Sequence, residues 1–206
     1  MDTKTQKSEL TLAAIVGAGI DIAGSEGLQA ITLQAVADRI GLSKSGVFSR
    51  IGSREALQKA VIEEFGRRFI AEVFAPAMQK PKGLPRLDDI VQRWIVRMRD
   101  VEVHHGCIYT AGAFELDDCE GALRDVLLNE VTRWRAALRR TVVQAVEVKH
   151  LQPDTEPEQL VGEICNLAMG LLHDADFCAI RVPPNVPRPP GCACARATRT
   201  EFVEST

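Results

Sequence analysis

A short run of small, polar and basic side chains near residue 46 has the chemistry needed to contact the phosphates and base edges of DNA. Lysine and arginine neutralise phosphates, and small polar side chains leave a helix slim enough to enter the major groove. The residues of this run that we expect to face outward are Lys44, Ser45, Gly46, Ser49 and Arg50. The run therefore predicts one helix of a DNA-binding motif, provided that neighbouring residues hold it in place.

The apolar residues around this run predict two short helices, at about 33–40 and 44–50, that cross closely. Ala37 is small where the second helix must approach the first, and Gly41 can adopt the left-handed conformation that the tight turn requires. This pattern predicts a helix-turn-helix at residues 32–51. The alternative is a helical hairpin whose polar face is only solvated.

The distribution of charge favours a local contact with nucleic acid. The net charge is −3 over the whole chain. Residues 1–68 contain nine Lys/Arg and eight Asp/Glu, whereas residues 43–59 contain four basic residues and only one acidic residue. A positive face within a mildly acidic protein is sufficient to steer it onto phosphates without general stickiness.

Almost every segment with a readable hydrophobic period has the spacing of an amphipathic helix, so we expect an all-α protein. Thr32, Ser43 and Ser53 stand where they can cap helices by accepting hydrogen bonds from free backbone N–H groups. The expected helices cover residues 8–24, 33–40, 44–50, 54–78, 87–103, 107–116, 122–149 and 156–180.

These helices suggest two domains and a tail. We expect an N-terminal three-helix helix-turn-helix domain at 1–53 and a helical ligand-binding and dimerisation domain at 54–182. Five of the ten prolines fall within 183–190, so no helix can form there, and we expect the tail at 183–206 to be disordered.

The composition of this tail is also what GC-rich coding DNA yields when it is read out of frame. We therefore hypothesise a frameshift near codons 174–182, which a neighbouring frame without a helical continuation would contradict.

Several classes of protein are disfavoured by what the sequence lacks. The N-terminus is polar, and no run of about 20 apolar residues occurs, so we expect a soluble, cytoplasmic protein that does not span a membrane. The six cysteines are then expected to be free thiols. No glycine-rich phosphate loop, nucleophile elbow or metal-spaced His-Glu pair occurs, so we expect neither an enzyme nor a cofactor.

The segment "GLQAITLQAVADRIGLSKSGVFSRIGSREALQKAV" resembles the signature of the TetR (tetracycline repressor) family of bacterial regulators, and the resemblance covers residues 12–61. Phe48 stands where that family usually has tyrosine, so only the packing of the ring is retained. The resemblance implies that Thr32, Arg50 and Arg54 contact phosphates, while the small residues face bases or nearby backbone. The implied DNA-binding set is Thr32, Ser43, Lys44, Ser45, Gly46, Phe48, Ser49, Arg50 and Arg54.

A looser resemblance continues through "HGCIYTAGAFELDD" and "GALRDVL", which are similar to a C-terminal domain found in part of that family. It implies a homodimer that pairs two long helices from each copy, and two recognition helices about one turn of double-stranded DNA apart. We therefore predict a repressor released from a near-palindromic operator by a small-molecule inducer. Alternatives are a dimerisation module with weak or no DNA binding, or an unrecognised enzyme.

In that family the second domain holds the inducer, and few charges lie among the candidate lining residues here, so we expect a mostly apolar ligand. Considered singly, each residue is more often an ordinary core residue than part of a binding site. The candidates are Trp94, Met98, Cys107, Tyr109, Phe114, Trp134 and Met169.

Two groups of potential metal ligands occur, and we expect no metal at either. His104, His105, Cys107 and Cys119 lie close together in the sequence, but adjacent histidines on a helix point in different directions and no paired ligand spacing supports them. The tail sequence Cys-Ala-Cys at 192–194 offers two sulfurs without the remaining ligands.

Overall fold

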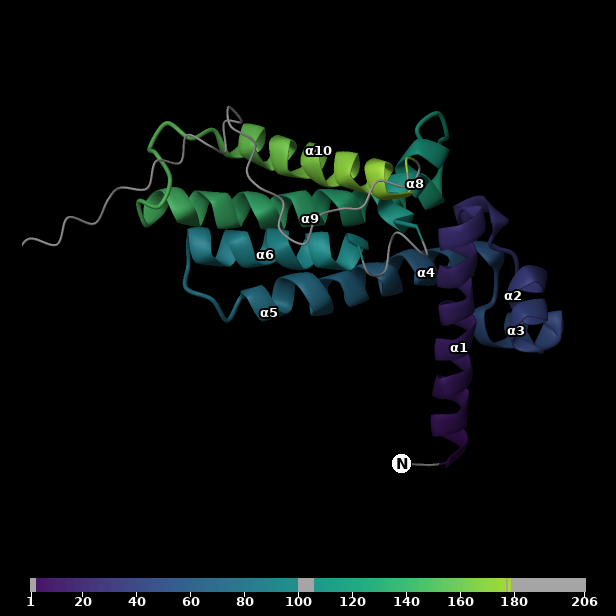
Figure 1. Cartoon of the computed structure of the whole chain (residues 1–206). Coiled ribbons are helices and arrows are strands. Elements are labelled where there is room, and N and C mark those ends of the chain that lie inside the picture. Colours follow the sequence, from purple (N-terminus) through teal and green to yellow (C-terminus); the bar gives the residue numbers. More distant parts are fainter. Residues whose placement is uncertain (1–2, 100–105, 177, 179–206) are drawn as a thin grey trace, which may run out of the picture. The chain divides into compact units, whose positions relative to one another are not determined.

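The computed structural model describes residues 3–99, 106–176 and 178, and every regular element within these ranges is a helix (Figure 1). The expected all-α fold is therefore confirmed. By packing, the chain divides into two units. The first contains Met1–Phe69 and Val101–Thr132, and the second contains Ile70–Asp100 and Arg133–Thr206. The domain boundaries expected from the sequence, after residues 53 and 182, remain predictions.

The first unit is built on a long N-terminal helix. Its helical elements are α1 (Thr3–Glu26), η1 (Leu28–Ala30), α2 (Leu33–Ile40), α3 (Lys44–Ile51), α4 (Arg54–Phe69), α8 (Ile108–Glu115) and the first part of α9 (Ala122–Glu147). Helix α1 packs against α2 and α4. Ile22, Val47 and Leu57 are almost completely buried, so an apolar core joins the short helices to the long ones.

Side chains next to the helix starts define the helix-turn-helix. The Thr32 hydroxyl accepts a hydrogen bond from the N–H of Ala35 at 3.0 Å, and the Ser43 hydroxyl accepts one from the N–H of Gly46 at 3.1 Å. Between the two helices, Gly41 has a φ of 67° and a ψ of 30°, the left-handed conformation that glycine adopts without strain. The two caps and the turn have the predicted form.

The second unit contains η2 (Ile70–Phe74), α5 (Ala75–Ala77), α6 (Leu84–Arg97), the rest of α9 and α10 (Pro157–Asp176). In Figure 1, α6, α9 and α10 lie side by side. Helix α6 begins at Leu84, earlier than the expected residue 87, and places Pro85 in its first turn. Proline is tolerated there because the N–H groups of the first turn have no partner within the helix.

One helical segment, Ser8–Glu26 within α1, is long and apolar enough to cross a membrane by length and composition. Such a match is weak evidence for a span, because the central helix of a folded domain passes the same test. In the first unit this helix forms the contacts with α2 and α4 described above. Its apolar side chains therefore have a packing role.

Candidate nucleic-acid interface

Helix α3 presents the predicted recognition surface. Ser43, Lys44, Ser45, Phe48, Ser49 and Arg50 are exposed, and Gly46 is half-buried. Val47, on the opposite face, is fully buried. The helix therefore has one side anchored in the core and one side available to solvent. Phe48 is 57% exposed, so its ring is not part of the domain core and can contact a partner.

Short local bonds hold the polar side chains of α3 close to the helix backbone. The Ser49 hydroxyl donates to the carbonyl oxygen of Gly46 at 3.0 Å, and the Arg50 guanidinium donates to the same oxygen at 2.9 Å. The hydroxyls of Ser43 and Ser45 lie 3.1 Å apart. These bonds are exposed to solvent, so a phosphate can compete for the Arg50 guanidinium without a change in the fold.

Arg54 has a role that the sequence did not indicate. Its guanidinium donates to the carbonyl oxygens of Ile31 at 3.0 Å and Gln29 at 2.5 Å. On the next turn of α4, the Gln58 amide donates to the carbonyl oxygen of Leu28 at 3.0 Å. Arg54 was expected to contact a phosphate directly. In this structure it fastens the segment before α2 to α4.

Glu115, at the end of α8, binds the other side of the same segment. Its carboxylate accepts hydrogen bonds from the backbone N–H groups of Leu28 and Gln29, each at 2.7 Å. Gly27 has a φ of 94°, and a Cβ atom there would lie 3.0 Å from a Glu115 carboxylate oxygen. The segment can approach the carboxylate this closely because residue 27 has no side chain. No local sequence signal marks Glu115, because its partners lie more than 80 residues away.

Helix α4 carries two carboxylates with a lowered pKa. The Glu64 carboxylate accepts hydrogen bonds from Arg67 and Arg68, which lower its pKa to about 2. At the start of the helix, the pKa of Glu55 is lowered by a hydrogen bond from its own backbone N–H and by Ser53. Both carboxylates are therefore ionised near neutral pH and stabilise the helix.

The structure separates the candidate ligand-binding residues into two groups. Cys107, Tyr109 and Phe114 belong to the first unit, whereas Trp94, Met98, Trp134 and Met169 belong to the second. In the first unit, the rings of Phe65 and Tyr109 are 5.0 Å apart, edge to face. Phe114 and Met169 are 71% and 41% exposed, so neither side chain is enclosed within its own unit.

The second unit contains an aromatic cluster of Phe74, Trp94 and Trp134. The Trp94 and Trp134 rings lie 5.2 Å apart and nearly perpendicular, and Phe74 lies 6.3 Å from Trp134. Arg97, one turn beyond Trp94 on α6, is buried and forms an ion pair with Glu72. The sequence did not predict this buried charge.

The potential metal ligands considered from the sequence are not brought together among the described residues. Cys107 is buried, and Cys119 is half-buried with its Sγ 3.9 Å from the carbonyl oxygen of Glu115. His104, His105 and the two tail cysteines at 192 and 194 lie outside the described residues. The tail at 183–206 lies outside them as well.

Comparison with known families adds independent information. Residues 83–184 match the family described as Tetracyclin repressor-like, C-terminal domain. This range includes α6, α8, α9 and α10. No match was found among curated protein sequences.

Solved structures share the arrangement of N-terminal helices followed by a helical domain. A TetR transcriptional regulator from Chloroflexus aurantiacus is 20% identical, with a TM-score of 0.73 over 87% of this chain and 90% of that chain. The ketosteroid transcriptional regulator KstR2 of Mycobacterium tuberculosis is 15% identical, with a TM-score of 0.61 over 85% of each chain. The fatty acid degradation regulator FadR from Bacillus halodurans is 12% identical, with a TM-score of 0.68 over 82% of this chain and 88% of that chain. At these identities the similarity establishes the fold.

Proposed function

Because this chain belongs to the TetR family of transcriptional regulators, we propose that it is a repressor released from a near-palindromic operator by a small, mostly apolar ligand. Members of this family bind operator DNA and dimerise, and they are regulators and not enzymes. Two copies then present two α3 helices to successive major grooves on one face of the DNA.

The observation that carries DNA binding is the exposed face of α3. Lys44 and Arg50 supply positive charge at its two ends, while the residues between them are small or polar apart from the buried Val47 and the ring of Phe48. Thr32 retains a hydroxyl hydrogen for a phosphate, because only its oxygen is used in capping α2. This arrangement supports phosphate contacts at the ends of α3 and base contacts between them.

Glu115 supplies a route from ligand to DNA within the first unit. Helix α8 contains both Tyr109, one of the candidate ligand-binding residues, and Glu115, which holds the segment before α2. A ligand that shifts α8 pulls on two hydrogen bonds to that segment and thereby moves Thr32 and α2. The shifted arrangement binds DNA more weakly, and by linkage bound DNA weakens ligand binding to the same extent.

The nature of the ligand is inferred from aromatic side chains in both units. The Phe65–Tyr109 pair and the Phe74–Trp94–Trp134 cluster offer large apolar surfaces. Two proteins of the same fold are named a ketosteroid transcriptional regulator and a fatty acid degradation regulator, and ketosteroids and fatty acids are mostly apolar. These observations support an apolar ligand for this chain too.

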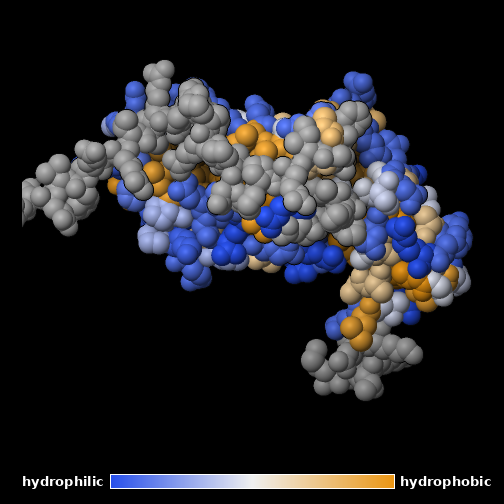
Figure 2. Space-filling view, in the orientation of Figure 1, coloured by the Kyte–Doolittle hydropathy of each residue, from blue (hydrophilic) through white to orange (hydrophobic). Residues whose placement is uncertain are grey.

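Dimerisation through α10 is supported by its surface. Figure 2 shows a hydrophobic patch over this helix between hydrophilic regions. The exposed large hydrophobic residues of α10 are Leu167 and Met169, which are 40% and 41% exposed. Because residues two apart lie on different sides of a helix, a second copy packed on one side of α10 would remove one of these side chains from water.

DNA binding is tested by titrating the protein against labelled DNA that flanks its own gene. Fluorescence anisotropy reports the bound fraction, and the titration is repeated at several salt concentrations. The double variant Lys44→Ala, Arg50→Ala is expected to bind at least about tenfold more weakly, with a salt slope reduced by about 2. The matched control is Lys80→Ala, Lys82→Ala, which removes two exposed charges from a loop of the second unit. It should bind like the wild type.

If the variant without Lys44 and Arg50 binds DNA as the control variant does, the α3 face is not used. That result would favour the alternative, a dimerisation module without DNA recognition. Footprinting on the bound fragment tests the operator separately. We expect two protected half-sites with centres about one helical turn apart. Protection of a single half-site would contradict the near-palindromic operator.

A further inference from the structure

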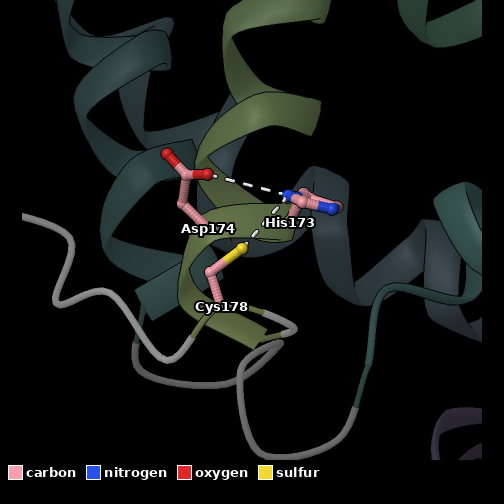
Figure 3. A group of neighbouring side chains, drawn as sticks. All are labelled: His173, Asp174 and Cys178. Atoms are coloured by element: carbon pink, nitrogen blue, oxygen red, sulfur yellow. Dashed lines mark hydrogen bonds and ion pairs between the residues drawn. The ribbon is translucent and has the colours of Figure 1, made fainter.

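We propose that the end of α10 forms a binding site for a Zn²⁺ ion, a function separate from operator and inducer binding. The proposed ligands are the imidazole of His173, the carboxylate of Asp174 and the thiolate of Cys178 (Figure 3). Their ligand atoms all lie within 4.8 Å of one another, and the three residues are exposed. All three belong to the second unit and lie far in sequence from the recognition helix.

Two of the three distances between ligand atoms are close to those of a tetrahedral zinc site. The Nδ1 atom of His173 is 3.6 Å from Oδ1 of Asp174 and 3.8 Å from Sγ of Cys178. Zinc bonds of about 2.0 to 2.3 Å place neighbouring ligand atoms about 3.3 to 3.6 Å apart in a tetrahedron. The two pairs that include His173 therefore have to close by only about 0.3 Å, whereas the carboxylate–sulfur pair, which lies within 4.8 Å, has to close by up to about 1.2 Å. Adjacent residues on a helix start in different directions, but Figure 3 shows the Asp174 carboxylate turned towards the ring nitrogen of His173 that the Cys178 sulfur also approaches.

The backbone places Cys178 beside His173. The N–H of Cys178 donates to the carbonyl oxygen of His173 at 3.2 Å, so the chain folds back onto the last turn of α10. The sulfur is thus brought next to the imidazole by a backbone bond, and rotation about exposed side-chain bonds is sufficient to complete the geometry.

The electrostatic environment favours a cation. Helix α10 ends at Asp176, and the last carbonyl groups of a helix carry a partial negative charge. The last turn contains no lysine or arginine that would repel a metal ion. The carboxylate of Asp174 adds a full negative charge at the same end.

The set of donor atoms selects the metal. Thiolate and imidazole prefer borderline ions such as Zn²⁺, whereas Mg²⁺ and Ca²⁺ prefer sites made entirely of oxygen ligands. On binding, the Cys178 thiol loses its proton to solvent and coordinates as thiolate. Three protein ligands leave the fourth tetrahedral position for water.

The experiment uses the full-length chain, freed of metal with a chelator and titrated with Co²⁺ as a spectroscopic substitute for Zn²⁺. We expect one Co²⁺ per chain, a sulfur-to-cobalt charge-transfer band and displacement of Co²⁺ by Zn²⁺. Cys178→Ser should abolish the charge-transfer band and weaken Zn²⁺ binding by at least about tenfold. His173→Ala should weaken Zn²⁺ binding to a similar extent.

Two controls separate this site from the other thiols. Cys119→Ser removes a half-buried thiol of the first unit and should leave the Co²⁺ spectrum unchanged. The double variant Cys192→Ser, Cys194→Ser removes the tail thiols and should also leave it unchanged. Loss of the band in that double variant, or its survival in Cys178→Ser, overturns the proposal, as does the absence of stoichiometric binding. Circular dichroism verifies that each variant is folded.

Discussion

The helix-turn-helix and the second unit are held together by interactions of different range. In the first, Thr32, Ser43 and Ser53 each cap a helix through the N–H three residues later. In the second, the N–H of Leu84 at the start of α6 donates to Nδ1 of His150, a residue 66 positions away. Local bonds fix the start of each short helix, whereas distant bonds make helix positions respond to changes elsewhere.

The largest effect is expected from the core beneath the local caps. Leu57 is fully buried in α4, so Leu57→Ala should lower the free energy of unfolding by about 2 to 5 kcal/mol and reduce DNA binding with it. Denaturant unfolding followed by circular dichroism measures the change. The control is Leu10→Ala in α1, where the side chain is 67% exposed and the expected change is within about 0.5 kcal/mol. Equal effects of the two variants would mean that capping bonds, and not the core, hold the domain.

The next effect tests the pair of long-range bonds from Glu115 to the segment before α2. Glu115→Gln leaves one backbone N–H facing an amide NH2, and we expect a loss of about 1.5 to 3 kcal/mol in unfolding free energy. Operator affinity should fall by about tenfold as the segment before α2 loosens. Glu120→Gln, at an exposed position in the following loop, is the matched control. Unchanged affinity in Glu115→Gln would remove α8 from the route between ligand and DNA.

A smaller effect isolates a single local cap. Ser43→Ala should lower the free energy of unfolding by about 1 kcal/mol, whereas Ser43→Gly should lower it by only about 0.3 kcal/mol. Thr132→Ala, at an exposed position within α9, should not destabilise the protein because alanine is the better helix former. The measurement is made without DNA, so any contact of Ser43 with phosphate does not contribute. A loss with glycine as large as that with alanine would show that the Ser43 side chain does not cap α3.

The smallest effect concerns the pH dependence of a local ion pair. The pKa of Glu64 is lowered from its ordinary value of 4.5 to about 2, so its contribution to stability is complete above pH 4.5. It is lost as the pH falls from 4.5 towards 2, because the unfolded state then binds the proton more readily. Since Arg67 is 68% exposed, solvent screening limits the contribution to less than about 1 kcal/mol. Glu64→Gln should flatten this part of the pH–stability curve, and high salt should do the same to the wild type.

Local chemistry explains why the recognition motif could be predicted from the sequence. The caps at Thr32 and Ser43 bond to atoms three residues away, and the left-handed Gly41 follows from its own backbone freedom. The chain could form these features before any tertiary contact exists. The all-α class was predictable for the same reason, since the three- and four-residue spacing of apolar side chains is a local property.

Tertiary structure alone decided the features whose partners are distant in the sequence. It assigned Arg54 to the carbonyl oxygens before α2, and it joined Glu115 to the N–H groups of Leu28 and Gln29. A charged side chain has many possible partners along a chain of 206 residues. Only the packing of the helices determines which of them lies within hydrogen-bonding distance.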